Sequence, residues 1–210
     1  MKSMSELSSS IAGGFWTIEN DDAGQGAQFE SVGETWQALS DYGYASDLMD
    51  GKRMPVRPLT FRQVRKSRFY DLLSSGTPHI IPVSDRLLDI LQSEGATGWK
   101  TFPLVLVDLK GRAVPGYRGL AITGKAGPPL WERSQRFIAE PEESWSPRLR
   151  MLRGIWFDEG TWDGSDLFTL KGTCFLLATD RIVRAMRKAR LKGIEWSRQS
   201  EVEILESAVK

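Results

Sequence analysis

The chain has 210 residues, and its 28 Lys or Arg and 27 Asp or Glu residues give a formal net charge of +1. A nearly neutral chain lacks the field that draws proteins to nucleic acid or anionic membranes, so neither is an expected partner. The one cysteine, Cys174, excludes an internal disulfide and a cysteine-based zinc site. No apolar run reaches the length of a signal peptide or a membrane span, which favours a cytoplasmic protein.

The N-terminal part of the chain is predicted to begin loosely and to continue in extended segments. Residues 1–13 lack hydrophobic periodicity and contain five serines, whereas residues 14–210 show no separating linker and are expected to form a single domain. Along the chain, the patterns predict a strand at residues 15–18, a turn at residues 21–26, an extended segment at residues 56–64 and a short helix at residues 65–73. Because Pro58 cannot donate to a β-ladder, residues 56–64 are expected to form an extended segment or an edge strand.

One stretch of the chain occurs twice. Residues 71–98 and 166–193 align without a gap at an offset of 95 residues. Five positions are identical, namely Asp71/Asp166, Leu72/Leu167, Asp85/Asp180, Arg86/Arg181 and Gly98/Gly193. The repeated positions have the character of caps, turns and core residues rather than of a reaction centre.

Each copy predicts a strand, a capped helix, a glycine turn and a further strand. Short apolar runs at residues 80–83 and 175–178 fit buried strands, and Ser84 or Thr179 then stands at a helix N-cap. The apolar spacing that follows forms one buried helical face, after which Gly98 or Gly193 supplies a left-handed turn. The expected fold is therefore α+β, a mixed twisted sheet flanked by helices, with two duplicated strand-helix-strand units at about residues 71–105 and 166–205.

The segment between the copies is predicted to be mostly β-structure. The patterns indicate a strand at residues 104–107, a turn at Lys110-Gly111, a returning strand at residues 117–123, a loop at residues 124–129, an exposed connector at residues 140–147, a strand at residues 151–157 and a turn-rich segment at residues 158–165.

Candidates for chemistry are few. His79 is the only histidine, and it aligns with Cys174 in the repeat, which favours packing over acid-base catalysis. The acidic turn contains Asp158, Glu159, Asp163 and Asp166, but its spacing does not match a calcium loop. Turn and cap roles are favoured, so neither an enzyme, a metal site nor a cofactor is expected. A hydrolase that uses this turn is the enzymatic alternative.

The two repeated helices differ in charge on their outward positions. Asp89, Gln92, Ser93 and Glu94 in the first copy correspond to Arg184, Arg187, Lys188 and Ala189 in the second. Exposed charge of this kind usually serves solvation, and cations also suit a helix C-terminus. The functional interpretation is a docking surface for an acidic patch of a partner protein.

Residues 70–205 resemble the immunity protein 11 family, bacterial proteins associated with polymorphic toxin systems. The resemblance is carried by Gly164-Ser165-Asp166-Leu167-Phe168, Thr179-Asp180-Arg181 and Leu191-Lys192-Gly193-Ile194-Glu195-Trp196, preceded by residues 83–87 and 98–104. The chain departs from the commoner pattern at Ala178 and Thr179, where the family has valine and serine. The shared motif supplies no binding residues.

The resemblance implies a cytoplasmic immunity protein that binds a cognate toxin and blocks it. The expected partner-binding residues are Arg184, Arg187 and Lys188, together with Glu159 and Trp162 of the acidic turn, because interfaces favour arginine and aromatic anchors. An adaptor or chaperone for a secreted effector would use similar contacts and is the alternative. The sequence leaves the oligomeric state open.

Overall fold

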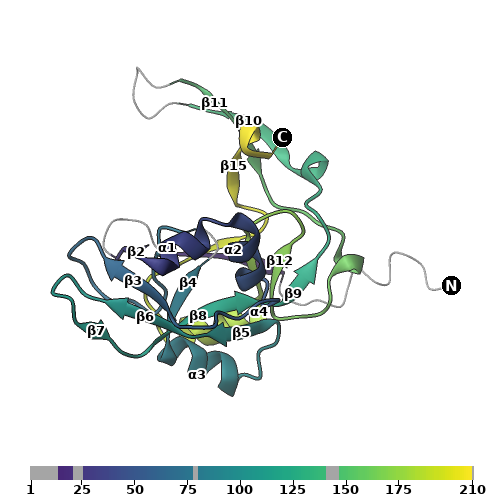
Figure 1. Ribbon diagram of the computed structural model, residues 1–210. Helices are drawn as coiled ribbons and strands as arrows, with labels where there is room; N and C mark the ends of the chain where they lie inside the picture. Colours follow the sequence, from purple (N-terminus) through teal and green to yellow (C-terminus); the bar gives the residue numbers. More distant parts are fainter. Residues whose placement is uncertain (1–13, 21–25, 78–79, 141–146, 210) are drawn as a thin grey trace.

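The computed structural model describes residues 14–20, 26–77, 80–140 and 147–209. Within these residues the strands form several mixed or antiparallel sheets with helices packed on them, so the α+β class is confirmed (Figure 1). The strands divide among separate sheets instead of one continuous sheet. The start predicted at residues 1–13, most of the turn at 21–26, His79 and most of the connector at 140–147 lie outside the described residues.

Both repeated segments fold as a strand, a helix and a second strand. In the first unit these are β4 (Ile81–Ser84), α3 (Asp85–Ser93) and β5 (Trp99–Phe102). In the second they are β13 (Leu176–Thr179), α4 (Asp180–Lys188) and β14 (Ile194–Arg198). Gly98 and Gly193 have φ values of 85° and 75°, so the predicted left-handed turns are confirmed.

A third strand from another part of the chain completes each unit. β8 (Tyr117–Ile122) lies between β4 and β5, and β1 (Phe15–Asn20) lies between β13 and β14, antiparallel to both neighbours in each case. Ser84 pairs with Tyr117 and Thr179 pairs with Phe15. At the other side, Trp99 pairs with Ile122 and Ile194 pairs with Asn20. The two three-stranded arrangements therefore share one register.

The three-stranded arrangement of the second unit is part of a larger sheet. β12 (Leu167–Leu170) and β9 (Gly124–Ala126) follow β13, giving the order β14-β1-β13-β12-β9. The prediction of a loop at residues 124–129 is thus wrong for its first three residues. A Cβ at Gly124 would stand 2.2 Å from the Leu167 carbonyl oxygen, so glycine permits the close approach of β9.

A four-stranded sheet and two further helices lie beside the first unit. Its order is β2 (Phe29–Ser31), β3 (Leu59–Gln63), β6 (Leu104–Val107) and β7 (Ala113–Val114). The segment predicted to be extended or an edge strand contains β3, which lies inside this sheet. Pro58 precedes the first paired residue, Leu59, so it interrupts no ladder hydrogen bond. The predicted hairpin at Lys110-Gly111 exists, yet its returning strand is β7, while β8 pairs elsewhere.

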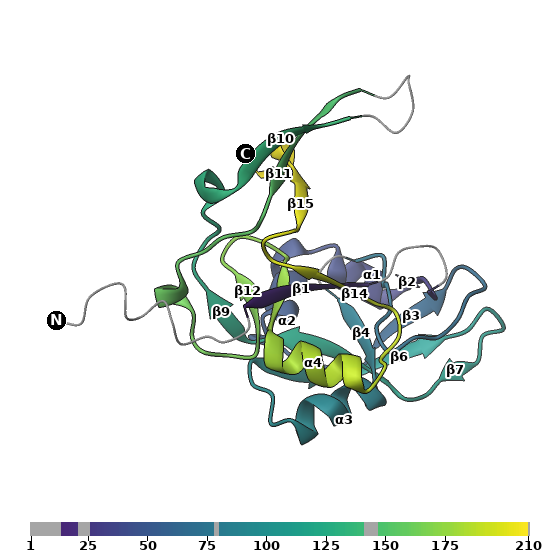
Figure 2. The ribbon, with the colours of Figure 1, turned by 180° about the vertical axis from the view of Figure 1, so that it is seen from behind.

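The helices α1 (Glu34–Leu39) and α2 (Tyr42–Met49) were not predicted. The Asp41 carboxylate caps α2 by accepting from the backbone N–H groups of Gly43 and Tyr44. Figures 1 and 2 place α1 and α2 on one side of the body and α3 and α4 on the other.

Residues 65–73 contain no helix, so that prediction is wrong. The backbone N–H groups of Asp71 and Leu72 instead donate to the Lys192 carbonyl oxygen, at 3.0 and 3.4 Å. These bonds hold the segment in an irregular, extended path against the second unit.

A three-stranded arm projects from the body (Figures 1 and 2). It consists of β10 (Gln135–Ala139), β11 (Leu149–Arg153) and β15 (Glu203–Leu205). The strand predicted at residues 151–157 begins earlier and ends at Arg153, because Ile155 and Phe157 leave the arm and are buried in the body. The described residues also form three short 3-10 helices, η1 (Trp131–Arg133), η2 (Glu159–Thr161) and η3 (Glu206–Val209).

The largest part of the core lies where the two units meet. α3 contributes Leu87 and Leu91, and α4 contributes Ile182 and Val183, all at most 2% exposed. Burial of each of these side chains contributes roughly 1.5–3 kcal/mol. The apolar faces predicted for the two repeated helices thus belong to one core that both units share.

Candidate functional site: the interlock and the basic face of α4

The repeated polar residues form one contact group in each unit. In the first, the Ser84 hydroxyl donates to Asp71 Oδ1 at 2.7 Å and accepts from Leu87 N at 3.1 Å, while Arg86 donates to Asp71 Oδ2 at 3.0 Å. In the second, the Thr179 hydroxyl donates to Asp166 Oδ1 at 2.9 Å, and Arg181 donates to Asp166 Oδ2 at 2.7 Å. The cap predicted for Ser84 is confirmed. Thr179 stands at the N-cap of α4, but its hydroxyl accepts no hydrogen bond from the first helical turn, so the side-chain cap predicted for it is wrong.

Each contact group also reaches across to the other unit. Asp71 Oδ2 accepts from Lys192 N at 2.7 Å, and Asp166 Oδ2 accepts from Thr97 N at 3.0 Å. Lys192 and Thr97 stand 95 residues apart, as the two aspartates do. The contacts made by one unit are therefore repeated by the other in the reverse direction.

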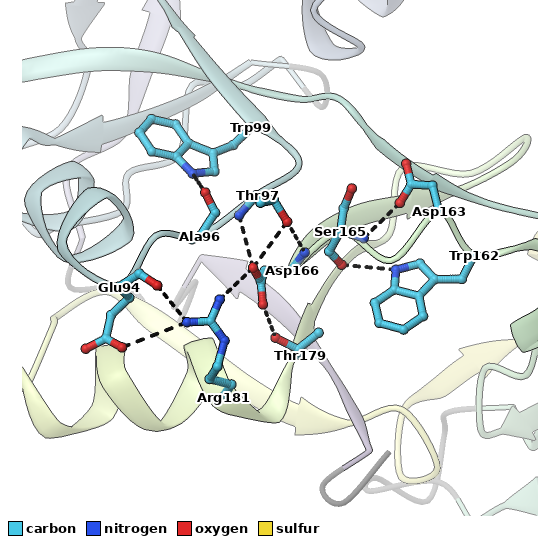
Figure 3. Close-up of polar contacts among 10 residues, drawn as sticks. All are labelled: Glu94, Ala96, Thr97, Trp99, Trp162, Asp163, Ser165, Asp166, Thr179 and Arg181. Atoms are coloured by element: carbon cyan, nitrogen blue, oxygen red, sulfur yellow. Dashed lines mark hydrogen bonds and ion pairs between the residues drawn. The ribbon is translucent and has the colours of Figure 1, made fainter. Parts of the chain in front are cut away.

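The two arginines extend this reciprocity to the helix ends. Arg181 Nη1 donates to the carbonyl oxygen of Glu94 at 2.7 Å (Figure 3), and Arg86 Nη2 donates to that of Ala189. Glu94 and Ala189 are the C-cap residues of α3 and α4, where carbonyl groups lack partners within the helix. We call the two aspartates, the two arginines and their hydroxyl and backbone partners the interlock.

Asp166 is almost enclosed, and its side chain is 12% exposed. Burial alone would raise the pKa of its carboxyl group. Hydrogen bonds from Thr97 N, the Thr179 hydroxyl and Arg181, with the charge of Arg181, outweigh burial and hold the pKa below its ordinary value (Figure 3). The carboxylate is thus ionised and fully engaged, which is the property of a structural ion pair.

The other carboxylates of the acidic turn hold backbone groups. Asp158 accepts from Gly160 N at 3.0 Å, and Asp163 accepts from Ser165 N at 3.0 Å and from Lys125 N at 2.8 Å. Among the residues that the structure describes, no three His, Cys, Asp or Glu side chains gather where they could hold a metal ion. Asp158 and Asp163 therefore fix the backbone of the turn that precedes β12.

The two predicted partner-binding residues of this turn lie in or next to η2 and not on α4. Glu159 is exposed in η2. The Trp162 indole donates to the Ser165 carbonyl oxygen at 3.0 Å, and its ring packs against Phe15 and Phe168, with centroids 5.1 and 5.6 Å apart. Much of Trp162 therefore belongs to the core.

The basic residues predicted on α4 form one exposed face. Arg184 pairs with Asp180 one turn earlier at 2.9 Å, and Lys188 is exposed. The Arg187 guanidinium carbon lies 4.2 Å from the centroid of the Trp16 ring. Arg198 of β14 lies over the same ring at 4.6 Å, so two guanidinium groups stack on one indole.

Arg198 and Trp16 were not predicted as part of this site. β1 and β14 are adjacent strands in which Trp16 pairs with Arg198, although the two residues are far apart in the sequence. The sequence indicated Arg198 only as one more basic residue, in the strand that follows α4. We define the basic face of α4 as Arg184, Arg187, Lys188 and Arg198 with Trp16 beneath them.

No protein-family model matches the chain, and no curated protein matches it either. No helix among the described residues is long and apolar enough to cross a membrane.

Proposed function

We propose that the chain is a bacterial immunity protein that binds a cognate toxin in the cytoplasm and blocks it without catalysing a reaction itself. The resemblance of residues 70–205 to the immunity protein 11 family is one support. The motif residues behind that resemblance include Asp166, Thr179 and Arg181, which are engaged in the interlock. Because these side chains hydrogen-bond to one another, they support a role in holding the fold, with toxin binding left to other, exposed residues. We also infer that the two units arose by duplication of one ancestral unit.

The observation that carries the proposal is the stacking of Arg187 and Arg198 on Trp16. A guanidinium held against an indole loses less conformational freedom when it meets a partner, because its position is already restricted. Trp16 itself is 8% exposed, so it acts as the support and the two arginines form the contact surface. Arginine and tryptophan are the residue types enriched at the energetic centres of interfaces.

The charge of this face indicates the kind of partner surface that fits it. Of the four cations of this face, Arg184 pairs with Asp180, to which the Trp16 indole also donates. The equivalent positions of Arg184 and Arg187 on α3 are Asp89 and Gln92. The toxin is therefore expected to present an acidic patch, within an interface of roughly 1,600 Å² in total.

The test is co-expression with the toxin encoded beside this gene in its native genome, followed by co-purification and a toxin activity assay. Arg187→Ala should weaken toxin binding about 30-fold or more, as expected when a central anchor is removed. Gln92→Ala changes the equivalent position of α3 and should leave the affinity unchanged. Thermal unfolding of both variants separates lost contact from lost folding.

Three outcomes would contradict the proposal. The first is an adjacent gene that encodes no toxin together with the absence of a co-purifying protein. The second is a bound toxin that keeps its full activity, which would favour the adaptor or chaperone alternative. The third is equal toxin binding by the Arg187 and Gln92 variants, which would move the interface away from the basic face of α4.

A further inference from the structure

A hollow of about 710 Å³ lies beside the interlock of the first unit. It is bordered by the irregular segment before Asp71, by β8 and by the turn after α4. Its lining includes Arg68, Phe69, Tyr70, Arg86, Tyr117 and Lys192, together with Asp71.

The hollow carries an excess of positive charge. Arg68, Arg86 and Lys192 stand against one carboxylate, that of Asp71. Asp71 already accepts from the Ser84 hydroxyl, Arg86 and Lys192 N. Within the described part of the chain, neither Arg68 nor the Lys192 ammonium group has an ion-pair partner, so these two charges remain available to an anion.

Aromatic rings form the apolar part of the same hollow. Phe69 is 40% exposed, and its ring centroid lies 6.5 Å from that of Tyr117. The Tyr117 hydroxyl donates to the Tyr70 carbonyl oxygen at 2.9 Å, which fixes the phenol ring. An exposed phenylalanine next to a fixed tyrosine offers a surface for a flat or apolar group.

The second unit shows that the interlock does not require these residues. At the offset of 95 residues, Arg68, Phe69 and Tyr70 correspond to Asp163, Gly164 and Ser165, and Lys192 corresponds to Thr97. A Cβ at Gly98 would clash with Ser165 as a Cβ at Gly193 would clash with Tyr70, so the correspondence holds in space. The same scaffold is built there with an acidic residue and small side chains, so packing alone does not demand the cations and rings of the first unit.

We propose that this hollow binds an organic anion, a carboxylate or phosphate group attached to an aromatic or other apolar body. Arg68 and Lys192 would hold the anionic group, and Phe69 and Tyr117 would contact the apolar body. The anion comes either from a free small molecule or from an acidic side chain beside an apolar one on a partner protein. The proposal is independent of the toxin-binding role, since it concerns a different surface and needs no partner for its test.

The test is an NMR titration of the ¹⁵N-labelled full-length protein with phenylacetate, phenyl phosphate and the neutral analogue phenylacetamide. Both anions should give saturable shifts in the amides of Arg68 to Asp71, Tyr117 and Lys192. Phenylacetamide should bind about tenfold more weakly, because it lacks the charge. An acetylated and amidated Phe-Glu dipeptide distinguishes the sources: tighter binding than phenylacetate indicates a partner side chain, and weaker binding indicates a free anion.

Variants tie the binding to the hollow. Arg68→Gln and Lys192→Gln lie on separate segments and should each weaken phenylacetate binding about tenfold. Arg62→Gln removes an exposed arginine on β3 that does not line the hollow and should have no effect. Equal binding of phenylacetate and phenylacetamide, shifts that map to another surface, or unchanged affinity in both well-folded variants would overturn the proposal.

Discussion

At the scale of single residues, the aspartates and arginines that are identical in the two copies make equivalent hydrogen bonds in both units. Asp71 and Asp166 each accept from a hydroxyl, an arginine and a backbone N–H group of the other unit. For Asp166, these donors outweigh burial and lower the pKa of the carboxyl group. The sequence favoured a turn or cap role for Asp166, and the structure gives its carboxylate hydrogen-bond partners in both units.

Replacement of Asp166 by asparagine should destabilise the protein by about 2 kcal/mol at pH 7, since a mostly buried charge partner of Arg181 is lost. Arg181 is 46% exposed, so water screens the pair and the effect is smaller than for a fully buried one. Urea unfolding of Asp166→Asn and the parent protein measures the difference.

The same substitution has a predicted pH dependence. The pKa of Asp166 is lowered on folding, so its contribution to stability is present above the ordinary value of 3.8 and is lost as the pH falls below that value through the folded pKa. The stability difference between the parent and Asp166→Asn should therefore be constant from pH 7 to about pH 5 and shrink below about pH 4. A difference that stays unchanged at pH 3 would contradict the ionised, hydrogen-bonded state of this carboxylate.

At the scale of elements, the two repeated helices end in the same way with different residues. The residue after the C-cap is left-handed in both, Gly95 with φ of 61° and Arg190 with φ of 54°. The next N–H groups, those of Ala96 and Leu191, donate back to Leu91 and Met186. Arginine adopts this conformation at a cost of roughly 1–2 kcal/mol that glycine does not incur.

Arg190→Gly should therefore stabilise the protein by about 1 kcal/mol, which thermal or urea unfolding would detect. Gly95→Ala is the matched change in the other unit. It should destabilise by a similar amount through the backbone alone, because a Cβ at Gly95 meets no atom within 4 Å. Loss of stability in Arg190→Gly would mean that contacts of the arginine side chain outweigh its strained backbone.

Local patterns predicted the elements whose signals lie close together in the sequence. The strands, helices and glycine turns of both copies follow from spacing, hydroxyl caps and apolar periodicity. The failures come from distant partners. β8 pairs with β4 and β5 instead of returning to β6, residues 65–73 are held extended by Lys192, and Arg198 meets Trp16 across a strand pair. No spacing rule predicts which residues of distant strands pair, so Arg198 and Trp16 of the basic face of α4 were missed.

At the scale of the whole molecule, neither unit can satisfy its own contact group alone. Asp71 needs the Lys192 N–H group, Asp166 needs that of Thr97, and Arg181 needs the end of α3. The core between α3 and α4 is also shared by both units. These dependencies predict that the two units unfold together, since loss of one leaves buried polar groups of the other without partners.

Native-state hydrogen exchange can test this coupling through Asp166→Asn, a substitution at a residue of the second unit that also accepts from Thr97 N of the first. A loss of about 2 kcal/mol from a shared unfolding reaction should speed exchange of the most protected amides about 30-fold in α3 and in α4 alike. Arg62→Gln on β3 provides the comparison, and it should leave both helices unchanged because its side chain is exposed. If exchange accelerated in α4 while the α3 amides kept the protection of the parent protein, the units would be energetically separate. The reciprocal hydrogen bonds would then join two independently stable halves instead of creating one cooperative structure.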